Sequence, residues 1–204
     1  MNNWLRSIVA TLALALGSGG LAGAAEFGPV AHASRAIALD GQIDSGDEQL
    51  FAKALLQRYG RGEKTEYLRL NSPGGNVYAG ARIAEVVHRL GLKVVVGPGE
   101  QCSSICMVIF AAGASRVFTP TSSLGVHSAL DTSASSEAMN GDGETADSLA
   151  VTALMARQMA DYGAPNSIIM KMVTTPGTEI TWIKTPELEQ GGWALCEERV
   201  KRRQ

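Results

Sequence analysis

The chain has few aromatic residues, few cysteines and no excess of charge of one sign. Among its 204 residues, Phe, Trp and Tyr make up 5%, cysteine occurs 3 times and the formal net charge is -2. A nearly neutral chain has no basic field to attract nucleic acid. Its cysteines and histidines do not stand at the spacing of a zinc site, and it contains no Gly-x-x-x-x-Gly-Lys phosphate-binding motif. We therefore expect no nucleic-acid partner, no metal and no cofactor.

A hydrophobic run long enough to span a membrane comfortably is also lacking, but residues 1–25 have the pattern of a secretion signal. Arg6 gives the positive start, residues 8–16 form a short apolar core, and small residues lead up to Ala24 and Ala25. The shortness of that core favours cleavage after Ala24 or Ala25 over an uncleaved N-terminal membrane anchor. We expect a periplasmic or secreted protein with no membrane span in its mature form.

The three cysteines are Cys102, Cys106 and Cys196. An exported protein can form disulfides, but an odd number leaves at least one thiol unpaired within a monomer. If Cys102 and Cys106 lie on one helix, their Cβ atoms are about 5–6 Å apart. A disulfide needs about 3.8 Å, so a bridge between them requires a distorted first turn. A bridge to Cys196, or small buried cysteines with no bridge, are the alternatives.

Strand-like and helix-like segments alternate along most of the chain, and 45% of the residues are hydrophobic, enough for one domain with a substantial core. We expect strands at 36–43, 67–70, 92–96, 116–118, 124–127 and 179–183, and helices at 44–58, 77–90, 103–112, 146–162, 166–173 and 185–190. This alternation predicts an α/β fold with mainly parallel strands.

Three segments lack this periodicity. Residues 26–33 are interpreted as a flexible lead-in. Residues 128–147 are rich in Ser, Thr, Asp, Gly and Glu and predict a mobile surface loop. Residues 197–204 form a charged tail. The folded domain is therefore expected to cover residues 26–196.

The loop Asn-Ser-Pro-Gly-Gly at residues 71–75 joins an expected strand to an expected helix. Such a turn presents main-chain N–H groups at a helix N-terminus, where developing negative charge is stabilised. Gly74 and Gly75 lack a Cβ, so an extended peptide can approach the main chain and pair with it. Taken alone, the same loop is consistent with an ordinary strand-to-helix turn.

Residues 67–128 resemble the proteolytic subunit of Clp protease, within the ClpP/crotonase superfamily. The matching segments are Leu-Asn-Ser-Pro-Gly-Gly at 70–75, Cys-Ser-Ser-Ile-Cys at 102–106, Phe-Ala-Ala-Gly at 110–113 and Ser-Leu-Gly-Val-His at 123–127. The Cys-x-Ser-x-Cys segment is similar, more specifically, to uncharacterised exported bacterial ClpP-like proteins. The resemblance implies a spiral of βαβ units, a homo-oligomer and a peptide or protein substrate.

The resemblance also implies the roles of individual residues. Ser104 stands at the family's distance in sequence from Gly75, which favours it over Ser103 as the nucleophile. A serine hydroxyl needs a base to accept its proton, and His127, at the end of an expected strand, is the candidate. The N–H groups of Gly75 and Ile105 would form the oxyanion hole.

The third member of a catalytic triad is not evident. The family has an aspartate just before the strand that leads to a Pro-Glu helix, and alignment on Pro186 places Ile180 there. Isoleucine cannot orient an imidazole or stabilise its charged form. The possible substitutes are Thr181, Glu179, Asp161 and Asp147.

The leading hypothesis is an exported serine peptidase that uses a Ser-His dyad or an incomplete triad. Related signal peptide peptidases use a Ser-Lys pair, which makes Lys171 an alternative base. The alternative of another class is a non-catalytic peptide-binding or assembly module on the same fold. Acyl-CoA chemistry of the crotonase type fits poorly, because an exported protein meets little CoA.

Overall fold

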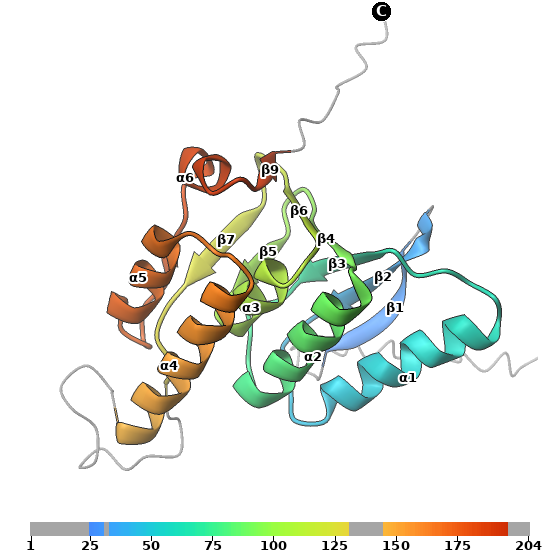
Figure 1. Ribbon diagram of the computed structural model, residues 1–204, viewed down its shortest axis with the longest axis horizontal. Helices are drawn as coiled ribbons and strands as arrows, with labels where there is room; N and C mark the ends of the chain where they lie inside the picture. Colours follow the sequence, from blue (N-terminus) through green and yellow to red (C-terminus); the bar gives the residue numbers. More distant parts are fainter. Residues whose placement is uncertain (1–24, 31–32, 131–144, 196–204) are drawn as a thin grey trace, which may run out of the picture.

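The structure is a computed structural model that describes residues 25–30, 33–130 and 145–195. Its strands are β1 (Glu26–Val30), β2 (Ala33–Asp40), β3 (Tyr67–Asn71), β4 (Lys93–Val96), β5 (Gln101–Ser103), β6 (Ser115–Phe118), β7 (Ser123–Val126), β8 (Thr181–Trp182) and β9 (Ala194–Leu195). Its helices are α1 (Asp47–Gly60), α2 (Val77–Leu90), α3 (Ile105–Ala111), α4 (Ala146–Asp161), α5 (Asn166–Thr174) and α6 (Thr185–Gln190) (Figure 1). The predicted signal peptide up to residue 24, the loop segment 131–144, Cys196 and the tail 197–204 lie outside the described residues.

Two sheets form the framework. One has the strand order β1-β2-β3-β4-β6-β9, in which every neighbouring pair except β1 and β2 is parallel. The other has the order β5-β7-β8, with β5 parallel to β7 and β8 antiparallel. The expectation of a mixed α/β fold with mainly parallel strands is confirmed.

A short bridge joins the two sheets at the end of β3. Ser72 pairs with Cys102 in parallel, and Ser103 N donates to Ser72 O at 3.1 Å. Ser103 in turn pairs with Gly125 of β7. The carboxyl ends of β3, β5 and β7 therefore lie together, and ligands of parallel α/β sheets bind at such ends.

The centre of the core is α3, which lies between the β5-β7 sheet and α2 (Figure 1). All seven of its residues, Ile-Cys-Met-Val-Ile-Phe-Ala, are fully buried. A helix that is apolar on every side must be enclosed by other elements. Trp193, near the end of the described chain, closes this core with its ring edge-on to Phe110, 5.2 Å between centroids.

The prediction of a flexible lead-in at residues 26–33 is wrong, because residues 26–30 form β1, antiparallel to β2. Gly28 and Pro29 make this strand difficult to predict from the sequence, because both residue types are depleted in sheets. At the edge of a sheet the missing N–H of proline costs nothing. The segment is anchored by Phe27, whose ring centroid lies 5.4 Å from that of Phe51.

Within the three described stretches, no helix combines the length and the apolar character that crossing a bilayer demands.

The packing of α2 on α3 gives a first prediction. A Cβ at Gly80 of α2 would lie 2.4 Å from Cγ1 of Ile105. Overpacking of this kind typically costs about 1–3 kcal/mol, more than the ~1 kcal/mol of helix propensity that alanine adds. Gly80→Ala should therefore lower the midpoint of thermal unfolding.

The matched control is Gly60→Ala in α1, where a Cβ has nothing within 4 Å. This change should leave the midpoint unchanged or raise it. A Gly80→Ala protein that is more stable than the wild type would contradict the packing described here.

Candidate active site

The glycine loop after β3 is held from two sides. On one side, Ser103 Oγ donates to Pro73 O at 3.0 Å. On the other, Ile43 N donates to Gly74 O at 2.8 Å, and Ile43 O accepts from Asn76 N at 2.7 Å. The loop is thus fixed between β5 and the segment that follows β2.

These contacts leave two main-chain donors without an acceptor. Asn76 caps α2 by accepting from Ala79 N at 2.9 Å, so Gly75 stands directly before the helix. Among the described residues, the N–H groups of Gly75 and Ile105 donate to no protein atom. Free N–H donors of this kind are what an oxyanion hole requires.

Ser104 occupies a left-handed turn between β5 and α3. Its φ is 58° and its ψ is -131°, and within the described residues no other non-glycine residue has a positive φ. Its N–H donates to Gly125 O at 3.1 Å. Gly74 lies against it so closely that a Cβ there would be 2.6 Å from Ser104 Cβ.

The two candidate serines differ in their surroundings. Ser103 is fully buried, and its hydroxyl already donates to Pro73 O. Ser104 is 7% exposed and lines a cavity. The structure thus gives Ser103 a structural contact and leaves the Ser104 hydroxyl available.

A disulfide between Cys102 and Cys106 encloses the Ser104 turn, with the two Cα atoms 5.2 Å apart. The expected helix at 103–112 begins too early, because Cys102 lies in β5 and α3 starts only at Ile105. The cysteines therefore do not share a helix, and the turn at Ser104 brings them close enough to bond.

His127 follows β7, and its Nδ1 lies 2.7 Å from the carbonyl oxygen of Ser128. A carbonyl oxygen only accepts hydrogen bonds, so Nδ1 carries the proton in the neutral ring and Nε2 is the basic nitrogen. Burial lowers the pKa of His127 below its ordinary value of 6.5, and the bond to Ser128 opposes part of this shift.

One cavity of about 280 Å³ brings four of the predicted site residues together, and Ile105 is not among the residues that line it. Ser104, His127, Gly74 and Gly75 all line it. Within the described residues no hydrogen bond joins Ser104 to His127. Catalytic hydrogen bonds are often long in unliganded enzymes and tighten when substrate binds.

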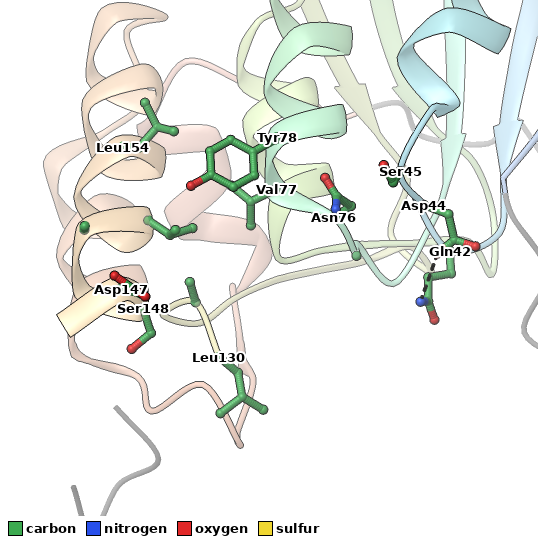
Figure 2. A pocket seen from close by; sticks show the side chains of 14 residues that line it. Gln42, Asp44, Ser45, Asn76, Val77, Tyr78, Leu130, Asp147, Ser148 and Leu154 are labelled. Carbon is green, nitrogen blue, oxygen red and sulfur yellow. Dashed lines mark hydrogen bonds between the residues drawn. The ribbon is translucent and has the colours of Figure 1, made fainter. Parts of the chain in front are cut away.

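A larger cavity of about 880 Å³ adjoins the first, and Gln42, Gly75 and Val77 line both. Figure 2 shows it between α4, with Leu154, Asp147 and Ser148, and the start of α2. Its wall combines apolar side chains with the carboxylates of Asp44 and Asp147. The lining residues are Gln42, Asp44, Ser45, Gly75, Asn76, Val77, Tyr78, Ala129, Leu130, Asp147, Ser148, Ala150, Val151 and Leu154.

Of the candidate third residues, Thr181 lies nearest to the histidine strand. It pairs with Val126, the residue before His127. Its hydroxyl forms a 2.7 Å hydrogen bond with that of Thr175, whose carbonyl accepts from Ser128 N at 2.9 Å. Thr181 therefore supports the backbone beside His127, with no hydrogen bond to the ring.

Neither the candidate carboxylates nor Lys171 forms an ion pair or hydrogen bond with His127 among the described residues. Asp161 is exposed beside Arg157 at the end of α4, and the next residue, Tyr162, packs against His88 near the far end of α2 from Gly75. Glu179 is exposed. Asp147 lines the larger cavity only. Lys171 pairs with Glu187 at 2.5 Å.

Two features of the site could not be predicted from the sequence. They are the carbonyl of Ser128, which accepts from His127, and the segment around Ile43, which supports the glycine loop. Both act through main-chain atoms, which every residue possesses, so no residue type marks them.

Ser104 at a strand-to-helix turn, His127 after β7 and the N–H of Gly75 thus meet at one cavity of an α/β fold, and these are group types that serine hydrolases use. The chain belongs to the Clp protease family, whose profile matches residues 29–160. A similar solved structure is that of a point mutant of ClpP1 from Listeria monocytogenes, with a TM-score of 0.58 and 18% identity over 81% of this chain and 93% of that one. At this identity the likeness shows the fold alone, and it confirms the ClpP-like architecture. No curated protein matches the chain.

The surroundings of His127 predict its titration. In an NMR titration the ring should have a midpoint below 6.5, with His127→Gln used to assign the signal. Because the unfolded chain binds this proton more readily, the free energy of unfolding should fall as the pH is lowered through about 6.5 towards the folded-state pKa. In the His127→Gln variant, this contribution to the pH dependence of the free energy of unfolding should be absent. A midpoint at or above 6.5 would disprove the assignment of a buried neutral ring.

The disulfide predicts a stability effect. In the chain-entropy account, a loop this short contributes about 2 kcal/mol. The double variant Cys102→Ala/Cys106→Ala should lose about this much in urea unfolding. Cys196→Ala leaves this disulfide intact and serves as the control. Equal midpoints for the double variant and the wild type would show that the bridge does not stabilise the fold.

Proposed function

We propose that the protein is an exported serine peptidase. Ser104 Oγ attacks the carbonyl carbon of a peptide bond while His127 Nε2 takes the hydroxyl proton. The developing oxyanion accepts hydrogen bonds from the N–H groups of Gly75 and Ile105. His127 then returns the proton to the leaving amine, and water hydrolyses the acyl-enzyme by the same route. The single observation that carries this proposal is the common cavity of Ser104, His127, Gly74 and Gly75.

The Ser128 carbonyl takes over one task of the missing acid. A triad carboxylate selects the histidine tautomer and stabilises the imidazolium. The hydrogen bond from His127 Nδ1 to Ser128 O supports the correct tautomer, but a neutral carbonyl stabilises the charged ring less than a carboxylate does. We therefore expect a dyad with modest turnover.

The larger cavity is the proposed place for the substrate chain. It continues from Gly75 and Val77, so a peptide paired with the glycine loop would extend into it. Its apolar wall suits apolar side chains. Asp44 and Asp147 would repel acidic residues and favour basic ones.

Export is proposed from the N-terminal pattern of residues 1–25, and the disulfide agrees with it, because disulfides persist in oxidising compartments. A homo-oligomer is proposed from family membership, and exposed apolar side chains of α4, β8 and α5 offer contact surfaces. These are Leu149, Leu154, Met170, Val173 and Trp182.

A specific observation favours the alternative of a non-catalytic peptide-binding module. Among the described residues, no carboxylate contacts His127 and no hydrogen bond links it to Ser104. A fold that retained the glycine loop but lost hydrolysis would have these properties.

Covalent labelling tests the proposal. A fluorophosphonate probe should label the wild-type protein at Ser104, and Ser104→Ala should abolish labelling. His127→Gln should slow it by about 10²–10⁴, the usual contribution of a general base. The matched control is Ser103→Ala, which removes the neighbouring hydroxyl and should still be labelled.

Labelling that persists in Ser104→Ala, or that is absent from the wild type, argues against the peptidase. In the second case, a fluorescent peptide that binds the wild type and Ser104→Ala equally, without turnover, would establish the binding module.

A further inference from the structure

Asp47, the first residue of α1, is a buried carboxylate. It is 1% exposed, and its Oδ2 accepts from Asp44 N at 2.8 Å and from Ala25 N at 3.0 Å. Ala25 is itself 4% exposed and packs within the hydrophobic core. The nitrogen of Ala25 is thus enclosed beside an acid.

No cation of the described residues forms an ion pair with this carboxylate. Lys53, which shares a small cavity with Ala25, is not paired with it either. Fully buried acids are rare unless they are paired, and burial of an unpaired charge is costly. A positive charge in contact with Asp47 would remove this cost.

The sequence supplies that charge at the required atom. Residues 22–24 read Ala-Gly-Ala, the small-x-small pattern after which a signal peptidase cuts. Cleavage after Ala24 turns the amide nitrogen of Ala25 into an α-ammonium group, at the atom already 3.0 Å from Asp47 Oδ2. Cleavage after Ala25 would remove this nitrogen from the chain.

We propose that export cuts the chain between Ala24 and Ala25 and that the new α-ammonium of Ala25 forms a buried ion pair with Asp47. This inference rests on the export included in the proposed function. A signal peptidase hydrolyses the bond with one water: the Ala24 carbonyl carbon gains the hydroxyl and becomes a carboxylate, and the Ala25 nitrogen takes up protons and becomes an ammonium.

The ion pair connects processing to the glycine loop. Asp47 holds Asp44 N, and the adjacent Ile43 bonds Gly74 O and Asn76 N on either side of Gly75. A Cβ at Gly75 would lie 2.1 Å from Ile43 O, so this segment lies directly against the loop. Asp47 is thus a positioning residue, and the processed N-terminus steadies the proposed oxyanion hole through it.

The first test is the N-terminus of the exported protein. The full chain is expressed in a Gram-negative host, purified from the periplasm or the medium, and examined by N-terminal sequencing and intact mass. The expected first residue is Ala25. A chain that begins at Glu26, or one that keeps its leader, overturns the inference.

The second test compares two chains whose N-terminal ammonium groups lie one residue apart. Two chains that both contain every described residue are released from fusions, one starting at Ala25 and one at Ala24. Both keep the Ala25 N–H donor, but only the first has an ammonium group at that atom. Asp47→Asn should lower the midpoint of thermal unfolding in the Ala25 chain roughly twofold more than in the Ala24 chain, because it leaves a buried ammonium unpaired. Equal losses in both chains overturn the ion pair.

If Asp47→Asn fails to fold, a measurement without that variant decides the question. In the native Ala25 chain the α-amine should resist acetic anhydride, whereas the unfolded Ala25 chain and the native Ala24 chain should react. Ready reaction of the native Ala25 chain contradicts the inference. Lys53→Gln is the control, and its Ala25 amine should stay protected.

The role of Asp47 as a positioning residue has its own readout. Well below the unfolding temperature, the Ala25 chain should be labelled by the fluorophosphonate faster than the Ala24 chain, and Asp47→Asn should remove the difference. Equal labelling rates in the two unsubstituted chains refute the link to the loop. Suppose that no chain is labelled, but that Ala25 is the N-terminal residue and its amine is protected. This result would refute the peptidase and the proposed link to the loop, but not the ion pair.

Discussion

The left-handed backbone of Ser104 is the constraint around which the site is built. A non-glycine residue in such a region typically costs about 1–3 kcal/mol and persists only where its surroundings hold it. Here a disulfide spans the turn, Gly125 accepts the Ser104 N–H, and the missing side chain of Gly74 leaves room for Ser104 Cβ. The same turn ends β5, begins the buried helix α3 and leaves the hydroxyl at the cavity. Stability of the core and presentation of the proposed nucleophile therefore depend on one backbone conformation.

The site relies on main-chain groups where side chains are more usual. The proposed oxyanion donors are the N–H groups of Gly75 and Ile105, and the partner of His127 is the carbonyl of Ser128. A carbonyl fixes a tautomer as a carboxylate does, but it brings no charge to balance an imidazolium. The low pKa of His127, caused by burial, agrees with a ring that is neutral at rest. In the proposed dyad, a charged His127 ring would therefore have weaker electrostatic support than in a complete triad.

The segment from Gly41 to Asp47 connects the N-terminal part of the folded chain to the glycine loop. It begins at the end of β2, where Gly41 N donates to Asn71 O at 2.9 Å, continues through Ile43 beside the glycine loop, and ends at the buried Asp47. Such a segment can restrain the glycine loop only if its own ends are held in place. The hydrogen bonds of the buried Asp47 hold one of these ends. Ala25, the residue directly before β1, donates to the same acid, so the N-terminal segment contacts this support as well as forming the edge of the sheet.

The sequence by itself determined the alternation of strands and helices, a helix near residues 103–112 and the glycine loop, because hydrophobic period and glycine content are local properties. Family spacing singled out Ser104 and His127 for the same reason: separation along the chain is visible without coordinates. Only the tertiary structure decided that β1 is a strand, that Cys102 and Cys106 are bonded, and that Ser128 O accepts from His127. Each of these depends on backbone geometry or on tertiary contacts, which residue type and spacing alone do not specify.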